Sequence, residues 1–137
     1  MEYQKTRRVV AVIIEKDDML LFGRKAKNKR PYPNKWLFIG GGIEDNETVI
    51  EALRREVTEE TAIELEDIEP LFIEEDDVVK DNERVHYVFL IVRARWKSGK
   101  PKPGDDIVEL RWVKRDELVT LDLPSPSTRI FKKMGLL

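Results

Sequence analysis

The alternation of apolar and polar positions along the chain predicts a sheet built from several strands. Short runs of β-branched and other apolar residues are separated by polar turns and by stretches rich in glycine and proline. The predicted strands are residues 8–14, 19–22, 36–39, about 71–73, 85–96 and 107–113. The segment 85–96 is the longest and carries apolar side chains on both faces from Tyr87 to Val92, so we expect a central strand covered on both sides.

A helical pattern occupies the second half of residues 41–63. The apolar stripe predicted to face the core consists of Ile50, Leu53 and Val57. We expect Asp45 or Asn46 to cap the N-terminus of this helix, and the acidic Glu47 suits its first turn.

The remaining segments complete an α/β pattern. We expect a linker at residues 65–69, a solvated strand end or turn at 74–77, a short helix at 115–121 and a terminal helix from about residue 127. Strands interleaved with helices, around a central strand that is apolar on both faces, indicate a sheet between helical layers. The length fits one domain spanning residues 1–137.

Composition narrows the class of protein. The chain is 41% hydrophobic and 38% charged, which is typical of a globular protein. Its net charge of −2 provides no basic field to attract a nucleic acid polymer. It has no cysteine, no signal-peptide core and no apolar run long enough for a membrane span. We therefore expect a cytoplasmic protein without a membrane partner.

A basic loop precedes the helical segment at residues 23–35. It carries six basic residues and no acidic one, and its prolines favour extended backbone. Such a loop is either a solvated connection or a binding segment for substrate phosphates. For phosphate binding, Arg24 and Lys25 are the best candidates, because they lie nearest the preceding strand.

The helical segment also carries a group of glutamates. Glu56, Glu59 and Glu60 are three and four residues apart, so their carboxylates share one helical face. Such a group is usually a solvated acidic face. Here Gly40, Gly41 and Gly42 precede it, and glycine allows backbone to approach a ligand closely. A glycine loop followed by clustered carboxylates indicates a metal–polyphosphate site.

This segment resembles the Nudix box, G-x5-E-x7-R-E-U-x-E-E-x-G-U, where U is a bulky apolar residue. The matching residues are Gly41, Glu47, Arg55, Glu56, Val57, Glu59, Glu60 and Ile63. Ala62 stands where the family usually has glycine, and because alanine disfavours a left-handed helix end, we expect a different exit turn. Asn46 also replaces a frequent glycine, but asparagine tolerates positive φ.

The resemblance implies the Nudix fold, a mixed β-sheet sandwiched between α-helices, and hydrolysis of a diphosphate linkage with Mg²⁺ or Mn²⁺. It assigns metal ligation to Glu56, Glu59 and Glu60 with the backbone carbonyl of Gly40, and the general-base role to Glu56. It gives Arg55 the role of orienting a neighbouring glutamate. The backbone of Gly41 and Gly42 would then lie against the substrate.

Family members often add an acidic ligand from a loop before a late strand. The candidates here are Asp105, Asp106 and Glu109, and we favour Asp106 or Glu109. The same residues also fit an ordinary solvated loop end.

The lone histidine and the aromatic residues remain open. We expect His86 to be structural, although a contact with a base or sugar is the alternative. The tryptophans Trp36, Trp96 and Trp112 fit core positions, and one of them, or Tyr32 or Phe38, is a candidate to cover a purine.

The box indicates the reaction class but leaves several substrates open. Our first choice is a nucleoside triphosphate, cleaved to the monophosphate and pyrophosphate as in MutT-type members. ADP-ribose is less favoured, because members that cleave it often carry a proline where this chain has Val79. Residues 20–25, 35–42, 86–96 and 110–112 also resemble GDP-mannose hydrolases, which depart from the box near the glutamates that this chain keeps. Hydrolysis of a nucleotide sugar is therefore the main alternative substrate class.

A catalytically inactive Nudix module that only binds a nucleotide or a protein is the alternative of a different class. Its expected sign is loss of box glutamates, and none is lost here. Family members often form homodimers, but no stretch of this sequence identifies an interface.

Overall fold

The architecture comes from a computed structural model that describes residues 5–26, 28, 32 and 35–137. Its elements in chain order are β1 (Lys5–Lys16), β2 (Met19–Lys25), β3 (Trp36–Leu37), β4 (Ile39–Gly42), α1 (Val49–Thr61), β5 (Glu64–Lys80), β6 (Glu83–Ser98), β7 (Ile107–Lys114), a 3₁₀ helix η1 (Arg115–Thr120) and α2 (Ser125–Lys133). Much of the predicted basic loop lies outside the described residues.

The described strands form one mixed sheet. Its order is β3-β2-β1-β6-β5, with β4 also paired to β1 and β7 paired to β2. β1 and β6 run parallel from Lys5↔Val85 to Glu15↔Arg95, and the other pairs are antiparallel. β6 therefore lies between β1 and β5, which confirms the prediction of a central strand.

Two neighbouring strands diverge in the middle of the sheet. β1 and β2 pair at Glu15↔Leu20 and Lys16↔Met19 and then separate. The space between them is filled by the next two strands, since β3 pairs with β2 and β4 pairs with β1. This arrangement places the three glycines of β4 opposite Val9, Val10 and Ala11.

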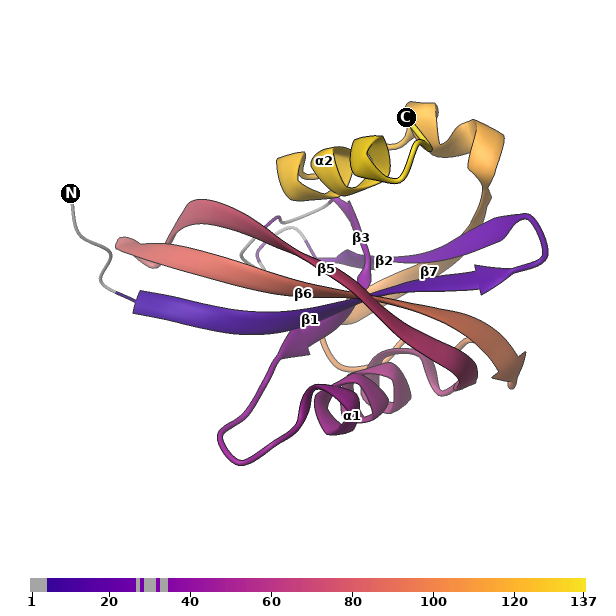
Figure 1. The fold of residues 1–137 in the computed structure, drawn as a ribbon, viewed down its shortest axis with the longest axis horizontal. Coiled ribbons are helices and arrows are strands. Elements are labelled where there is room, and N and C mark those ends of the chain that lie inside the picture. Colours follow the sequence, from indigo (N-terminus) through magenta and orange to yellow (C-terminus); the bar gives the residue numbers. More distant parts are fainter. Residues whose placement is uncertain (1–4, 27, 29–31, 33–34) are drawn as a thin grey trace.

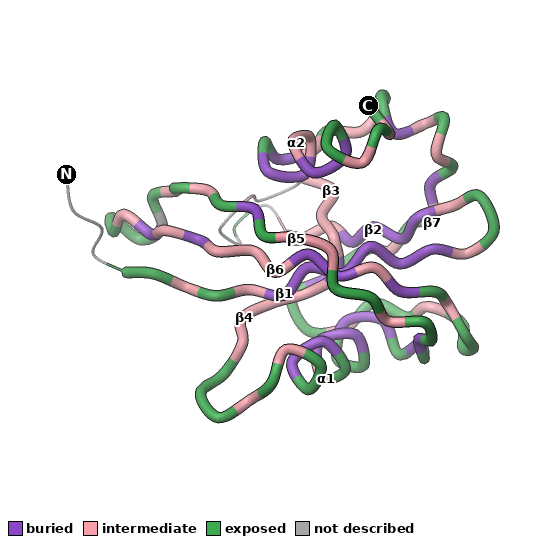
Figure 2. The backbone as a smooth tube through the Cα atoms, in the orientation of Figure 1, coloured by how far each residue is buried: buried purple, intermediate pink, exposed green. Residues whose placement is uncertain are grey.

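Helices cover both faces of the sheet (Figure 1). Successive side chains of a strand point to opposite faces, so Val10 and Val12 pack in the core under α1 while Ala11 and Ile13 pack in the core under α2. Buried residues are accordingly concentrated in the central strands and on the sides of both helices that face the sheet (Figure 2). Burial of each such large apolar side chain contributes about 1.5–3 kcal/mol. The predicted mixed sheet between helices is confirmed.

Two segments that we expected to be irregular lie inside a long strand. Residues 65–69 and 74–77 both belong to β5, which pairs with β6 over nearly its whole length. The register shifts near residues 66–72, and these irregularities accommodate Pro70, which cannot donate a hydrogen bond to the ladder. Glu74, expected to be solvated, is buried because Arg129 and Lys133 of α2 pair with its two carboxylate oxygens.

The start of α1 also differs from the sequence prediction. Thr48, and neither Asp45 nor Asn46, is the N-cap, and it forms a capping box with Glu51. Asn46 instead has a positive φ of 67°, as asparagine tolerates. Ile50, expected in the apolar stripe, is 37% exposed, because the face that packs on the sheet is centred on the buried Leu53 and Val57.

The helix exit keeps the geometry that glycine would favour. Ala62 adopts the left-handed conformation, with φ of 60°, and its N–H is bonded to the carbonyl of Thr58. The expectation of a different exit turn was therefore wrong. Among the described residues, no helix combines the length and apolarity that crossing a membrane requires.

Candidate functional site

The glutamates of α1 lie against the glycines of β4. Glu56 and Glu60 are buried because they flank Leu53 and Val57 on the side of α1 that packs onto the sheet. A methyl group on Gly41 would lie only 2.5 Å from the carboxylate carbon of Glu56, so this carboxylate occupies space that only glycine leaves open. The N–H of Gly40 donates to Oε1 of Glu60 at 2.9 Å.

The loop between β6 and β7, residues 99–106, brings a third carboxylate next to Glu56 and Glu59. Oxygens of Glu56, Glu59 and Asp105 all lie within 4.8 Å of one another. The loop is held there by backbone bonds to the last turn of α1, from Lys102 N–H to the carbonyl of Thr61 and from Gly104 N–H to that of Glu60. These bonds satisfy carbonyls that a helix end leaves unpaired.

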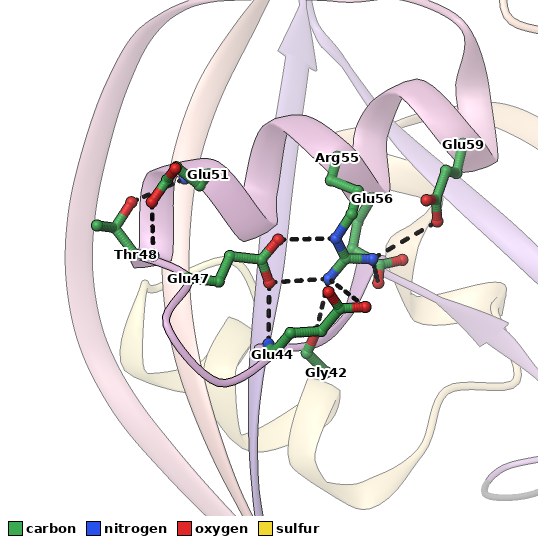
Figure 3. Close-up of polar contacts among 8 residues, drawn as sticks. All are labelled: Gly42, Glu44, Glu47, Thr48, Glu51, Arg55, Glu56 and Glu59. Atoms are coloured by element: carbon green, nitrogen blue, oxygen red, sulfur yellow. Dashed lines mark hydrogen bonds and ion pairs between the residues drawn. The ribbon is translucent and has the colours of Figure 1, made fainter.

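Arg55 connects the loop before α1 to this carboxylate group (Figure 3). Its Nε and Nη2 donate to both carboxylate oxygens of Glu47 at 2.7 and 3.0 Å. Its Nη1 donates to Oε1 of Glu56 at 2.8 Å and lies 3.6 Å from Glu59, and its Nη2 also donates to the carbonyl of Gly42. The guanidinium thus fixes the Glu56 side chain relative to the glycine strand.

The environment shifts the pKa values of these groups in opposite directions. Burial raises the pKa of Glu60 to about 8, although the N–H of Gly40 opposes the rise. Burial also raises the pKa of Glu56, against the hydrogen bond from Arg55. In contrast, the hydrogen bond from Arg55 lowers the pKa of Glu47 to about 2. The buried carboxylates therefore lack sufficient positive charge from the protein, whereas Glu47 is well paired.

These donors fit a hard divalent cation. The converging group consists of carboxylate oxygens, the ligands that Mg²⁺, Mn²⁺ and Ca²⁺ prefer. Two of the box glutamates are held by the protein itself, Glu56 by Arg55 and Glu60 by Gly40, so their carboxylates are oriented before a cation binds.

A cavity of about 250 Å³ adjoins the carboxylates. Part of its wall is polar and comprises Lys25, Gly40, Gly41, Gly42, Glu56, Glu60, Asp105 and Asp106. Another part carries Arg7 and aromatic side chains, Tyr32, Phe38, Tyr87 and Phe89. Residues at the start of α2, including Ser127 and Ile130, complete it. A ligand with a charged end and a flat apolar end would match this wall.

The structure separates the residues that the sequence grouped as candidates. Lys25 reaches the cavity wall, whereas Arg24 forms an ion pair with Glu109 at 2.9 Å. Asp106 lines the cavity, but Asp105 is the acidic residue that joins Glu56 and Glu59.

Of the remaining candidates, some line the cavity and others do not. His86 lies between Asp77 and Glu75 of β5, at 2.7 and 3.0 Å, away from the cavity wall. These two hydrogen bonds raise its pKa. Tyr32 and Phe38 line the cavity, and the three tryptophans are packed against the two cores.

Sequence reasoning did not single out Arg7, Tyr87 or Phe89 as site residues. Alternation along β1 and β6 places them on one face of the sheet, but the same pattern is typical of core positions. The sequence offered no signal that separates Arg7 from its charged neighbours Lys5 and Arg8, because β1 begins with exposed polar residues and is buried only from Val10.

Comparison with known proteins agrees with this geometry. The family model described as the NUDIX domain matches residues 5–134. The chain belongs to the Nudix family, as its sequence motif predicted.

Among its relatives are proteins named nucleoside triphosphatase NudI. The protein from Enterobacter sp. (strain 638) is 30% identical over 140 residues, covering 97% of this chain and 99% of the relative. The one from Salmonella schwarzengrund (strain CVM19633) is 31% identical with the same coverage.

Solved structures share the fold. The MutT protein from Methanosarcina mazei Go1 superposes with a TM-score of 0.79 at 22% identity, covering 98% of this chain and 96% of that one. The MutT NUDIX hydrolase from Burkholderia pseudomallei gives a TM-score of 0.73 at 28% identity, covering 91% and 94%. The predicted Nudix fold is confirmed.

Proposed function

We propose that this protein hydrolyses a nucleoside triphosphate to the monophosphate and pyrophosphate with the help of Mg²⁺ or Mn²⁺. The observation that carries the proposal is the convergence of Glu56, Glu59 and Asp105 on the polar wall of a cavity that also has an aromatic wall. The similarity to proteins named nucleoside triphosphatase, over nearly the whole chain, supports the choice of substrate.

The cation would be held by Glu56, Glu59 and Asp105, with Glu60 and the carbonyl of Gly40 beside them. Asp105 takes the place that we first gave to Asp106 or Glu109, because it lies within reach of the two glutamates while Glu109 pairs with Arg24. When bound, such a cation neutralises phosphate charge and makes water a stronger nucleophile.

Glu56 is the proposed base. Arg55 occupies its Oε1, which leaves Oε2 to take a proton from the attacking water. The water oxygen forms a new bond to phosphorus, the anhydride P–O bond breaks, and pyrophosphate leaves. Arg55 acts as a positioning residue, since its donors are taken by Glu47, Glu56 and Gly42.

Lys25 is the proposed phosphate-binding cation. It lines the polar wall, and its charge opposes part of the rise that burial causes in the pKa of Glu60. Gly41 and Gly42 lie on the same wall. The carboxylate of Glu56 and the guanidinium of Arg7 take the space that their side chains would fill, and we propose that substrate phosphates approach the backbone beside these groups.

The test is hydrolysis of a panel of nucleotides with Mg²⁺, read by release of pyrophosphate or monophosphate. The panel includes nucleoside triphosphates, GDP-mannose and ADP-ribose, so that turnover of the sugar nucleotides alone would overturn the choice of substrate. Tight metal-dependent binding without turnover of any member would favour the inactive binding module instead.

A variant tests the carboxylate group. Glu59→Gln should lower kcat at least about tenfold, the usual cost of disturbing a metal site, and leave the fold intact. The matched control is Glu66→Gln, which changes an exposed glutamate of β5 outside the site. Equal activity of the two variants would contradict the proposed ligand set.

A further inference from the structure

The hydroxyl of Tyr87 is a buried polar group on the cavity wall. The residue is 4% exposed, and its Oη has no hydrogen-bond partner within the part of the chain that the structure describes. Buried polar groups are nearly always hydrogen-bonded, because leaving one unpaired is costly. Since Tyr87 lines a cavity, a ligand can supply the missing partner.

Arg7 lies beside Tyr87 in the sheet. Arg7 and Tyr87 are register partners in the parallel pair of β1 and β6, and both line the cavity. The guanidinium lies over the glycine strand, where a methyl group on Gly42 would be 2.9 Å from its Nη2. The charge of Arg7 opposes the burial that raises the pKa of Tyr87, so the two groups interact electrostatically. No described carboxylate forms an ion pair with Arg7.

Aromatic rings lie next to this pair of polar groups. Phe89, two residues along β6, stacks with Tyr87 at a centroid distance of 5.8 Å and an interplanar angle of 17°. Phe38 and Ile130 add apolar surface to the same cavity. Flat apolar walls with a few fixed polar groups are typical of sites that bind a planar ring and select its orientation.

The separation from the carboxylates suits a nucleotide. Gly40, whose N–H binds Glu60, pairs with Ala11, and Arg7 lies four residues earlier on the same strand. Four strand residues correspond to about 13 Å between the backbone positions. The guanidinium of Arg7 reaches back over Gly42, which pairs with Val9, so its charged end lies nearer to the carboxylates than its backbone does. A nucleotide that places its phosphates by the carboxylates would therefore extend its base toward Arg7 and Tyr87.

We propose that Arg7 and Tyr87 read the base of the substrate and select guanine, uracil or thymine over adenine and cytosine. This rests on the proposed function, which supplies the nucleotide. Arginine only donates hydrogen bonds, so Arg7 requires an acceptor, and O6 of guanine or O4 of uracil and thymine supplies one. In the three keto bases that oxygen adjoins a ring N–H, which the hydroxyl of Tyr87 can accept. Adenine and cytosine present an amino group at the same edge, where it would meet the donors of Arg7.

The experiment compares kcat/KM for UTP with CTP and for GTP with ATP, in wild type and in Tyr87→Phe. Within each pair the ring size and the phosphates are the same, and a carbonyl oxygen beside a ring N–H is replaced by an amino group beside a ring nitrogen acceptor. Wild type should prefer the keto member at least about fivefold, the lower end expected from one good pair of hydrogen bonds. In Tyr87→Phe, which removes only the hydroxyl, the ratio should fall toward one, mainly through KM. A wild-type ratio near one, or an unchanged ratio in the variant, overturns the proposal.

Arg7→Met and Arg8→Met form the matched pair for the guanidinium. Arg8 is the next residue on β1 and points to the other face of the sheet, away from the cavity wall. Loss of base preference in Arg7→Met with retention in Arg8→Met supports base reading. An equal loss for all four nucleotides in Arg7→Met would instead assign Arg7 to the phosphates and overturn it.

Binding separates this proposal from the hydrolysis proposal. Calorimetric titration with UMP, CMP, GMP and AMP measures base preference without turnover, and near-UV circular dichroism checks that each variant is folded. Failure to hydrolyse any triphosphate would refute the proposed function alone, because a keto preference among the monophosphates would still support base reading. Equal affinities for all four would refute base reading while leaving hydrolysis intact.

Discussion

Replacing Gly41 by alanine should damage the carboxylate site and leave the fold nearly intact. The added methyl would lie 2.5 Å from both the carboxylate carbon and Oε1 of Glu56, and 2.7 Å from Oε2. These atoms are the end of a flexible side chain, so the carboxylate moves away and the backbone stays in place. Restoring ordinary contact distances requires a shift of roughly 1 Å, and misplacement by that amount can cost about 100-fold in rate.

Gly41→Ala should lower the free energy of unfolding only slightly. The displaced carboxylate gives up its charge-assisted hydrogen bond from Arg55, worth about 1.5–3 kcal/mol, but it regains water on leaving its buried position, so we expect a net cost of about 1 kcal/mol. For a domain of this size that corresponds to a fall in Tm of about 3–5 °C. In contrast, Gly40→Ala would place a methyl 1.9 Å from the backbone carbonyl of Val10, which cannot rotate away, and should cost about 3 kcal/mol or more.

The assay measures kcat with a nucleoside triphosphate, Mn²⁺ affinity by calorimetry, and Tm by circular dichroism for both variants. Gly41→Ala should lower kcat about 10- to 100-fold and weaken Mn²⁺ binding, while Gly40→Ala should mainly lower Tm. If Gly41→Ala keeps kcat and Mn²⁺ affinity within about twofold of wild type, the location of the Glu56 carboxylate has no bearing on the site, and the reasoning fails.

Further expectations concern the cations, the α2 contact and the start of α1. Lys25→Ala should raise KM about tenfold or more, and Arg24→Ala should raise it less, because Arg24 pairs with Glu109. Steady-state kinetics of both variants measure the two KM values, and a larger rise in Arg24→Ala would contradict this assignment. Burial raises the pKa of Glu74, but the hydrogen bonds from Lys133 and Arg129 outweigh it, so the folded pKa lies below the ordinary value of 4.5. The stability contributed by Glu74 is then fully present above pH 4.5 and is lost as the pH falls through the lower folded pKa. In urea unfolding, the difference in free energy of unfolding between wild type and Glu74→Gln should therefore become smaller in acid, and a larger difference there would contradict the argument. Thr48→Ala removes the cap of α1 and should cost about 0.5–2 kcal/mol in the same unfolding assay, where no change would show that the cap is dispensable.

The part of the site carried by α1 was predictable because it is local. Spacing of three and four residues places Glu56, Glu59 and Glu60 on one face of any helix, whatever surrounds it. The glycines before the helix are also adjacent in sequence, and they pair with β1 beside the carboxylates.

The remaining parts depend on contacts between distant segments. Asp105, Asp106 and Glu109 look alike in sequence, and the choice among them is made where the loop before β7 bonds to the last carbonyls of α1. Glu74 looked solvated because its two cationic partners lie on α2, more than 50 residues away. Tyr87 follows the alternation of a core strand, and only the assembled sheet shows that this residue lines a cavity and that its buried hydroxyl has no partner among the described residues.

The divergence of β1 and β2 affects which substitutions can alter the ligand preference of this domain. The strands that fill the gap let one cavity draw its wall from both helical layers, with acidic side chains from α1 and apolar ones from α2. The two helices are far apart along the chain, and they pack against opposite faces of the sheet. Substitutions near the C-terminus can therefore reshape what the pocket accepts while the hydrolytic apparatus stays as it is, so that new preferences can arise without rebuilding the chemistry.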